Sequence, residues 1–222
     1  MRNKSTKTLA TNVNSGMWLV PELIANDRYK EAVDAATALK GGCQKARMPK
    51  FLVLAANHEK RAKSLLKDFS RIGVKTNDPN VEVNEAKSAQ LGKFYCFNVA
   101  DWGRGIPWLL KSKDTLLVRL AKMETATLKT AETYAQLGDG WAAYARSLSR
   151  LQRAPAEQRA RHWYTIAYRT HRSNGSSLVR QTIARKLEDL PAPTAAIYVR
   201  GVMDDTDTFT IYSDRATWSR QL

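Results

Sequence analysis

Residues 91–110, LGKFYCFNVADWGRGIPWLL, are the stretch from which the fold of this chain is best predicted. The stretch reads as the end of one helix, a tight turn and the start of a second helix. Gly92 lets a neighbouring helix approach closely, and Tyr95 fills the space beside it. Residues 98–101 have turn chemistry, and the side chain of Asp101 is suited to cap the following helix. We therefore predict a helical hairpin here rather than an active site.

The start of the second helix in this stretch has a counterpart earlier in the chain. Trp102 is followed three residues later by Gly105, and Tyr29 is followed at the same spacing by Ala32. In both places an aromatic residue precedes a small one, and an aliphatic residue comes next. Trp108 adds a second bulky group to the later copy. This internal repeat predicts two places where a turn aromatic covers the close approach of two helices.

The spacing of these residues resembles the tetratricopeptide repeat, which is a pair of antiparallel helices. Half of the first-helix pattern, L-G-x-x-Y, is present at Leu91, Gly92 and Tyr95. The fuller pattern W-x2-L-G-x2-Y, with the two aromatic types exchanged, is present at Tyr134, Leu137, Gly138 and Trp141. The second-helix spacing A-x3-F-x2-A is present at Ala160, Tyr164 and Ala167. These matches indicate a degenerate helical repeat.

We predict a mainly α fold of antiparallel helical hairpins, a tetratricopeptide-like α-solenoid, over residues 17–190. Residues 1–16 are polar and without periodicity, so they are expected to form a flexible basic tail. Gly41–Gly42 is expected to end the second helix and to leave Cys43 in a loop. Residues 191–193, Pro-Ala-Pro, form a linker. In residues 194–222 the pattern changes to a period of two, which predicts a short β hairpin or a truncated β-module.

Two further helices have a clear apolar seam. The seam of a long helix that starts near Pro49 and ends at Gly73 comprises Phe51, Ala55, His58, Ala62, Leu65, Phe69 and Ile72. Its opposite face is basic, with Lys60, Arg61, Lys63 and Lys67. The inward side of the last helix is predicted to carry Val179, Ile183, Leu187 and Leu190. Spacings that alternate between three and four are typical of amphipathic helices that lie along a neighbour.

The net charge of +15 is concentrated in two parts of the chain. Residues 1–75 carry 15 Lys and Arg against 6 Asp and Glu, and residues 142–186 carry 10 against 1, so each part has a charge of +9. The plain interpretation is a solvated exterior. The alternative is a face that binds nucleic acid or another polyanion. Its candidate residues are Arg146, Arg150, Arg153, Arg159, Arg161 and Arg169.

The chain carries none of the common catalytic or nucleotide-binding motifs. Its three histidines, His58, His162 and His171, are dispersed, and two cysteines make neither a disulfide framework nor a metal site. Glu132 and Asp139 come nearest to a carboxylate pair, but Gly138 interrupts their helix face. We therefore expect no enzymatic activity, no catalytic residue, no metal and no cofactor. No apolar run is long enough to span a bilayer or to serve as a signal peptide, so a cytoplasmic location is the default expectation.

The helical residues also resemble a segment of large, uncharacterised multidomain proteins of planctomycete bacteria. The resemblance is carried by residues 91–110, by YAQLGDGWAAYARS at 134–147 and by RARHWYTIAY at 159–168. In those proteins a degenerate tetratricopeptide-like region leads into a β-rich module, which here corresponds to residues 200–204 and 216–218. The resemblance implies no reaction and no catalytic residue, and it implies that the β-module continues beyond Leu222.

The sequence thus favours a non-enzymatic helical scaffold that mediates interaction with a protein or peptide and belongs to a larger multidomain protein. The alternative is an electropositive module for nucleic acid or another polyanion. Retention on heparin with a steep salt dependence distinguishes the alternative from the scaffold.

Overall fold

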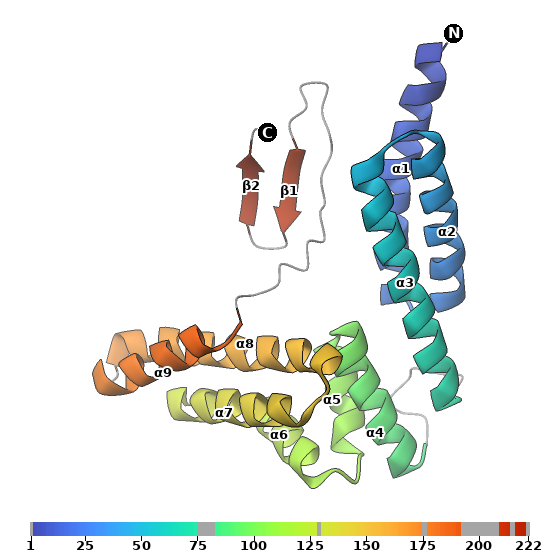
Figure 1. The fold of residues 1–222 in the computed structure, drawn as a ribbon. Coiled ribbons are helices and arrows are strands. Elements are labelled where there is room, and N and C mark those ends of the chain that lie inside the picture. The colour runs from blue at the N-terminus through green and yellow to red at the C-terminus, as the bar shows by residue number, and fades with distance from the viewer. Residues whose placement is uncertain are drawn as a thin grey trace. The chain divides into compact units, whose positions relative to one another are not determined.

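The structure, a computed structural model, describes residues 2–74, 83–127, 130–174, 177–191, 209–213 and 216–220. Within these residues the chain is mainly helical, as predicted (Figure 1). The contacts divide the chain into two compact units, with the boundary between Arg71 and Ile72. Two helical cores therefore take the place of the single domain predicted over residues 17–190.

The first unit contains three helices, α1 (Arg2–Ala25), α2 (Tyr29–Lys45) and α3 (Pro49–Ile72). Its core consists mostly of aliphatic side chains and alanines, with Tyr29 as the one aromatic residue that is fully buried there among the described residues. The Tyr29 ring packs on Phe69 with 5.1 Å between ring centroids, which joins the start of α2 to the end of α3.

Helix α1 begins at Arg2 instead of near Met17, so the structure has no flexible tail over the described part of residues 1–16. Two positions within residues 2–16 of α1 contact α2. Val13 is buried in one cluster with Leu39 and Cys43 of α2. Gly16 lies so close to α2 that a Cβ on it would be 2.8 Å from Leu39 Cδ1. These contacts hold the turn at Val13 and Gly16 against α2, and the side chains of residues 2–12 lie outside the described residues.

Helix α2 continues through Gly41–Gly42, where the sequence predicted its end. Cys43 is therefore buried in the helix and not in a loop. A Cβ on Gly42 would lie 3.7 Å from Val13, an ordinary van der Waals distance, and a Cβ on Gly41 would meet no atom within 4 Å. The chain turns only at Arg47, which has a left-handed backbone with φ 54°. The left-handed residue that follows the helix is therefore Arg47 and not one of the two glycines.

Helix α3 has the seam and the end that the sequence predicted. The fully buried members of the seam are Ala55, Ala62, Leu65 and Ile72, and the others are half-buried. Gly73 follows the helix with φ 67°, a conformation that glycine adopts without strain.

The second unit contains α4 (Glu85–Lys93), the π-helix η1 (Phe94–Val99), α5 (Trp102–Leu110), α6 (Thr115–Thr125), α7 (Ala131–Ser147), α8 (Arg150–Asn174) and α9 (Ser177–Asp189). Four of these helices begin at a side chain that accepts a backbone N–H, namely at Asn84, Asp101, Asp114 and Thr130. The cap at Asp101 is the one that the sequence predicted.

The central stretch forms a helix pair, but its turn is shorter than predicted. The helix continues through η1 to Val99, and Ala100 with φ 68° makes the reversal on its own. Gly92 lies where α5 approaches α4 most closely, because a Cβ on Gly92 would be 2.9 Å from the Leu109 backbone nitrogen. Gly105 is similarly placed, with a position for Cβ 3.0 Å from the Cys96 nitrogen.

Helices α7 and α8 form the most extensive helix pair among the described residues, and α9 packs against α8. Figure 1 shows α7 and α8 side by side, joined by a short connection. The core of this unit is rich in aromatic residues and includes Phe97, Trp141, Tyr144, Trp163 and Tyr164.

Near the C-terminus, β1 (Phe209–Ser213) and β2 (Ala216–Arg220) pair antiparallel, with Ile211 opposite Trp218. Residues 192–208, where the first predicted strand and most of the linker fall, lie outside the described residues. The predicted β-module therefore stays a prediction.

Candidate functional site

A buried carboxylate lies among three helices of the second unit. Glu124, in the last turn of α6, has a side chain that is only 3% exposed. It accepts hydrogen bonds from the indole nitrogens of Trp141 on α7, at 2.6 Å, and of Trp163 on α8, at 2.8 Å. Arg159 on α8 donates through Nε at 2.9 Å and through a second nitrogen that forms an ion pair with the other carboxylate oxygen. We call Glu124, Trp141, Arg159 and Trp163 the Glu124 cluster.

The polar groups of the Glu124 cluster are bonded to one another. Three of the four bonds to the carboxylate end on Oε1, and the Arg159 ion pair is made through Oε2. The guanidinium of Arg159 lies between two aromatic rings, 4.9 Å from the centroid of Trp102 and 5.0 Å from that of Trp163. Charge, hydrogen bonds and cation–π contacts are therefore all satisfied within the chain. The cluster joins α6, α7 and α8.

Aromatic rings surround the Glu124 cluster. Trp102 meets Trp141 edge-on with centroids 4.9 Å apart, and Tyr134 stacks on Trp163 at 5.7 Å. Cys96 is buried in the same core. Burial raises the pKa of the Cys96 thiol well above its usual range, and the negative charge of Glu124 adds to the shift. A neutral thiol in this position is a packing residue and a poor nucleophile.

The α7–α8 pair contains a second polar group, on the side of α9. A Cβ on Gly138 would lie 2.8 Å from Tyr164 Cγ, so the tyrosine ring occupies the space that the glycine leaves. The Tyr164 hydroxyl donates to Asp139 at 2.6 Å, and Lys186 of α9 contacts the same carboxylate oxygen at 2.5 Å. Burial, together with the bond to Asp139, raises the pKa of Tyr164. Asp139 thus bonds to Tyr164 of α8 and to Lys186 of α9.

Nearly all predicted repeat residues are buried at helix contacts. The buried ones are Tyr29, Ala32, Leu91, Gly92, Tyr95, Gly105, Trp108, Leu137, Gly138, Trp141, Ala160, Tyr164 and Ala167. Trp102 and Tyr134 are half-buried. These positions therefore hold helices together and offer little surface to a partner.

The six candidate anion-binding arginines separate into distinct roles. Arg159 does bind an anionic group, but that group is Glu124 of the same chain. Arg161 donates to carbonyl oxygens at the end of α9 and just after it, namely that of Leu187 at 2.7 Å and that of Pro191 at 3.1 Å. Solvent-exposed arginines are Arg146, Arg153 and Arg169. The side chain of Arg150 lies outside the described residues.

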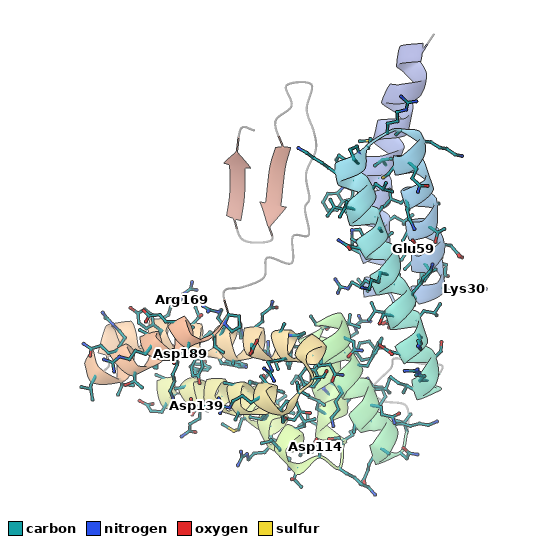
Figure 2. The ribbon with its side chains drawn as sticks, viewed as in Figure 1. Lys30, Glu59, Asp114, Asp139, Arg169 and Asp189 are labelled. Carbon is teal, nitrogen blue, oxygen red and sulfur yellow. The ribbon has the colours of Figure 1, made fainter. Side chains whose placement is uncertain are left out.

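The first unit also holds a carboxylate at a helix contact. Glu59 of α3, labelled in Figure 2, accepts from Lys63 at 2.6 Å, from Lys40 of α2 at 3.0 Å and from Thr37 at 3.4 Å. Its side chain is 12% exposed, while both lysines extend into solvent. The hydrogen bonds from Lys63 and then Lys40 lower the pKa of Glu59 to about 2. We call these four residues the Glu59 cluster.

Histidine and cysteine side chains are not gathered into a site. Within the residues described, no group of three His, Cys, Asp or Glu residues is arranged to hold a metal ion. His58 is half-buried on the α3 seam, and burial lowers its pKa. His162 packs edge-on against Trp163 with 5.0 Å between centroids. The side chain of His171 lies outside the described residues. In the same part of the chain, none of the helices has both the length and the apolar character to cross a membrane.

Large aliphatic side chains are exposed on the outer faces of three helices. They are Leu19 on α1, Val53 and Leu54 on α3, and Leu178 and Val179 on α9. Leu178 is 72% exposed and Val53 is 62% exposed. Val179 was expected to face inward, but it is 39% exposed, because Ile183 takes the buried position on α9.

Sequence reasoning missed both carboxylate clusters, although each leaves a trace in the helical periodicity. Leu117, Leu120 and Ala121 lie on the buried face of α6, and Glu124 continues the same face. Glu59 follows Ala55 by four residues in the same way. A carboxylate at an apolar position of a helix is the signal, since burial demands a charged or hydrogen-bonding partner.

Comparisons with known proteins return no match, whether with protein-family profiles, with curated proteins or with solved structures.

Proposed function

We propose that this chain is a non-enzymatic helical scaffold that binds a protein or peptide partner and belongs to a larger multidomain protein. Two carboxylates of the second unit are bonded within the fold. Glu124 binds Trp141, Arg159 and Trp163, and Asp139 binds Tyr164 and Lys186. The recognition surface is then the outside of the helices.

The arrangement of the second unit supports this proposal. Helices α7 and α8 form a pair with a glycine–tyrosine contact at Gly138 and Tyr164, and α9 packs behind α8. Repeated helix pairs of the tetratricopeptide type present an extended surface to a peptide or a partner domain. The α-solenoid interpretation and the membership in planctomycete-type proteins are parts of the proposal.

The observation that carries the proposal is the exposure of large aliphatic side chains. Leu178 and Val53 stand on helices whose inner faces are already packed against neighbours. Exposed aliphatic groups of this size gain free energy, about 1.5–3 kcal/mol for full burial of each, when a partner covers them. Each unit, taken by itself, carries such exposed side chains.

The polyanion-binding alternative keeps some support. Arg146, Arg153 and Arg169 are exposed on α7 and α8, and the chain has a net charge of +15. Arg159 and Arg161, however, are used inside the fold, so the candidate arginine face loses two of its members. An exposed aliphatic side chain gains nothing from a phosphate backbone. We therefore place protein binding first.

Site-specific photo-crosslinking tests this function. A photoreactive amino acid is placed at Val53 or Leu178, with the exposed Ala143 on α7 as control position. We expect a protein adduct from the Val53 and Leu178 positions in cells that produce the chain. The adduct protein, purified separately, must then bind the pure chain in calorimetry.

Two results contradict the proposal. One is an adduct protein that fails to bind the pure chain. The other is retention of the chain on heparin with a steep salt dependence and no protein adduct, which would favour the polyanion alternative.

A further inference from the structure

We propose that the outer face of α3 binds an acidic amphipathic helix of the partner protein. This inference rests on the proposed scaffold function and names the surface and the partner chemistry. The argument uses only the exposed residues of α3, their spacing and their ion pairs.

The outer face of α3 is a continuous strip with helical spacing. The strip consists of Val53, Asn57, Lys60, Ser64 and Lys67, all of them exposed. Their separations alternate between four and three residues, which places them on one side of an α-helix. At a rise of about 1.5 Å per residue the strip is about 21 Å long. That length accommodates about four turns of a second helix.

The strip has an apolar end and a cationic end. Val53 and its neighbour Leu54, which is 49% exposed, form the apolar end. Lys60 and Lys67 form the cationic end. Neither lysine has an ion-pair partner among the residues that the structure describes, whereas Lys63 is paired with Glu59 and Arg71 with Asp68. The two unpaired positive charges are therefore available to an external carboxylate.

This combination fits a protein helix better than a nucleic acid. A helix with aliphatic residues at one end and carboxylates further along buries Val53 and Leu54 while it pairs with both lysines. A nucleic acid would use the lysines for phosphates but leave the two aliphatic side chains uncovered. Base stacking needs exposed aromatic rings, and the strip contains none.

The test uses the full chain and synthetic helical peptides of about 20 residues, long enough to form a stable helix. One peptide has leucines at alternating spacings of three and four, flanked by glutamates. The second peptide replaces every glutamate by lysine. Two variants of the chain remove the proposed contacts, Lys60→Glu with Lys67→Glu, and Val53→Asp with Leu54→Ser. The matched control, Arg119→Glu with Lys122→Glu, makes the same charge change on exposed positions of α6.

We expect the glutamate peptide to bind the unaltered chain and the lysine peptide not to bind. Each α3 variant should weaken binding by about tenfold or more, a change of about 1.4 kcal/mol. The control variant should bind within about twofold of the unaltered chain. Hydrogen exchange should slow on residues 50–70 when the glutamate peptide is added. Circular dichroism shows whether each variant keeps its helices.

Several outcomes overturn the inference. Absence of peptide binding, equal loss in the α6 control, or tighter binding of a single-stranded RNA than of the glutamate peptide each do so. If the partner found by crosslinking binds the Lys60→Glu, Lys67→Glu variant normally, the α3 face is not the docking site, but the scaffold function stands. If no protein partner exists, the scaffold function itself fails.

Discussion

The two units hold a carboxylate in opposite ways. In the second unit Glu124 is almost completely buried, and its partners Trp141, Arg159 and Trp163 come from two other helices. In the first unit Glu59 keeps some exposure, and one of its two lysines lies on the same helix, a single turn away. A buried carboxylate depends on every partner, whereas an accessible one can exchange a lost partner for water.

The hydrophobic cores around the two carboxylates also differ in composition. The Glu124 cluster is enclosed by rings such as Trp102 and Tyr134, and the core of the first unit is built largely from alanines and aliphatic side chains. Large rings with polar atoms specify orientation, while small side chains permit close helix approach with less directional preference. We therefore expect the second unit to respond sharply to single substitutions and the first to respond weakly.

The largest expected effect is that of Glu124→Ala. The substitution leaves the Arg159 charge and two indole N–H groups buried without their acceptor, so we expect a loss of about 3–5 kcal/mol in the free energy of unfolding. Urea unfolding followed by tryptophan fluorescence measures it. Glu59→Ala is the matched control and should shift the unfolding midpoint far less. Equal shifts for the two variants would remove the distinction between the clusters.

Two glycine-to-alanine substitutions, one in each unit, are expected to change stability by an intermediate amount. Gly138→Ala places a methyl group against the Tyr164 ring and should cost about 1–3 kcal/mol. Gly41→Ala meets no atom within 4 Å and lies inside α2, so it should stabilise the first unit by about 0.5–1 kcal/mol. Thermal unfolding by circular dichroism compares the two. A neutral Gly138→Ala would show that α8 is not held against α7 at this point.

The two thiols report how tightly each core is closed. Cys43 and Cys96 are both buried, and burial raises the pKa of both, to a greater degree for Cys96. We expect a thiol reagent at neutral pH to modify Cys43 several-fold faster than Cys96. Mass spectrometry of the intact chain and its peptides gives the two rates. Faster labelling of Cys96 would mean that the aromatic core opens more readily than the first unit.

The smallest expected effects concern pH, and their signs differ between the units. The pKa of Glu59 is lowered to about 2, so its contribution is complete above about pH 4.5 and is lost as the pH falls towards 2. Burial raises the pKa of Tyr144 to about 12 and also raises that of Tyr164, so their contribution is complete below about pH 10 and is lost at higher pH. The protection of backbone amides from hydrogen exchange, corrected for the intrinsic exchange rate at each pH, should therefore fall in the first unit in acid and in the second unit in alkali.

One variant serves as the control for the acid response and another for the alkaline response. Glu59→Gln should flatten the acid response of the first unit without changing the alkaline response of the second. Tyr164→Phe should reduce the alkaline response alone. Late tyrosine ionisation is read directly from ultraviolet absorbance, and titration of all tyrosines near pH 10 would contradict the assignment.

Features that depend on neighbouring residues could be predicted from the sequence. The cap at Asp101, the seam of α3 and its end at Gly73 are local, because each is set by residues one or two turns apart. For such features both partners lie within a few residues of each other. The close approach at Gly92 was predicted in a different way, from the pattern L-G-x-x-Y, and its partner Leu109 lies on the next helix.

Features that depend on distant residues could not be predicted. Glu124 finds Trp141 at a separation of 17 residues, Arg159 at 35 and Trp163 at 39. Val13 of α1 packs against Leu39 and Cys43, which lie 26 and 30 residues further along the chain. Composition and helical periodicity do not identify which residues that are far apart in the sequence come into contact. The docking surface on α3 required knowledge of which lysines are already paired.

The π-helix η1 sets the rotational phase between the two halves of the central helix pair. A π turn takes more residues than an α turn, so η1 holds surplus chain between Gly92 and Gly105. One residue in an α-helix corresponds to about 100° of rotation. Loss of one residue from Phe94–Val99 would remove that surplus and leave an α turn, so Gly105 would still face Cys96 and Leu109 would still face Gly92. Loss of one residue from α4 or α5 has no such reserve and would turn everything after it by about 100°. The π turn is therefore a place in the central helix pair where the chain can give up a residue and keep its glycine contacts.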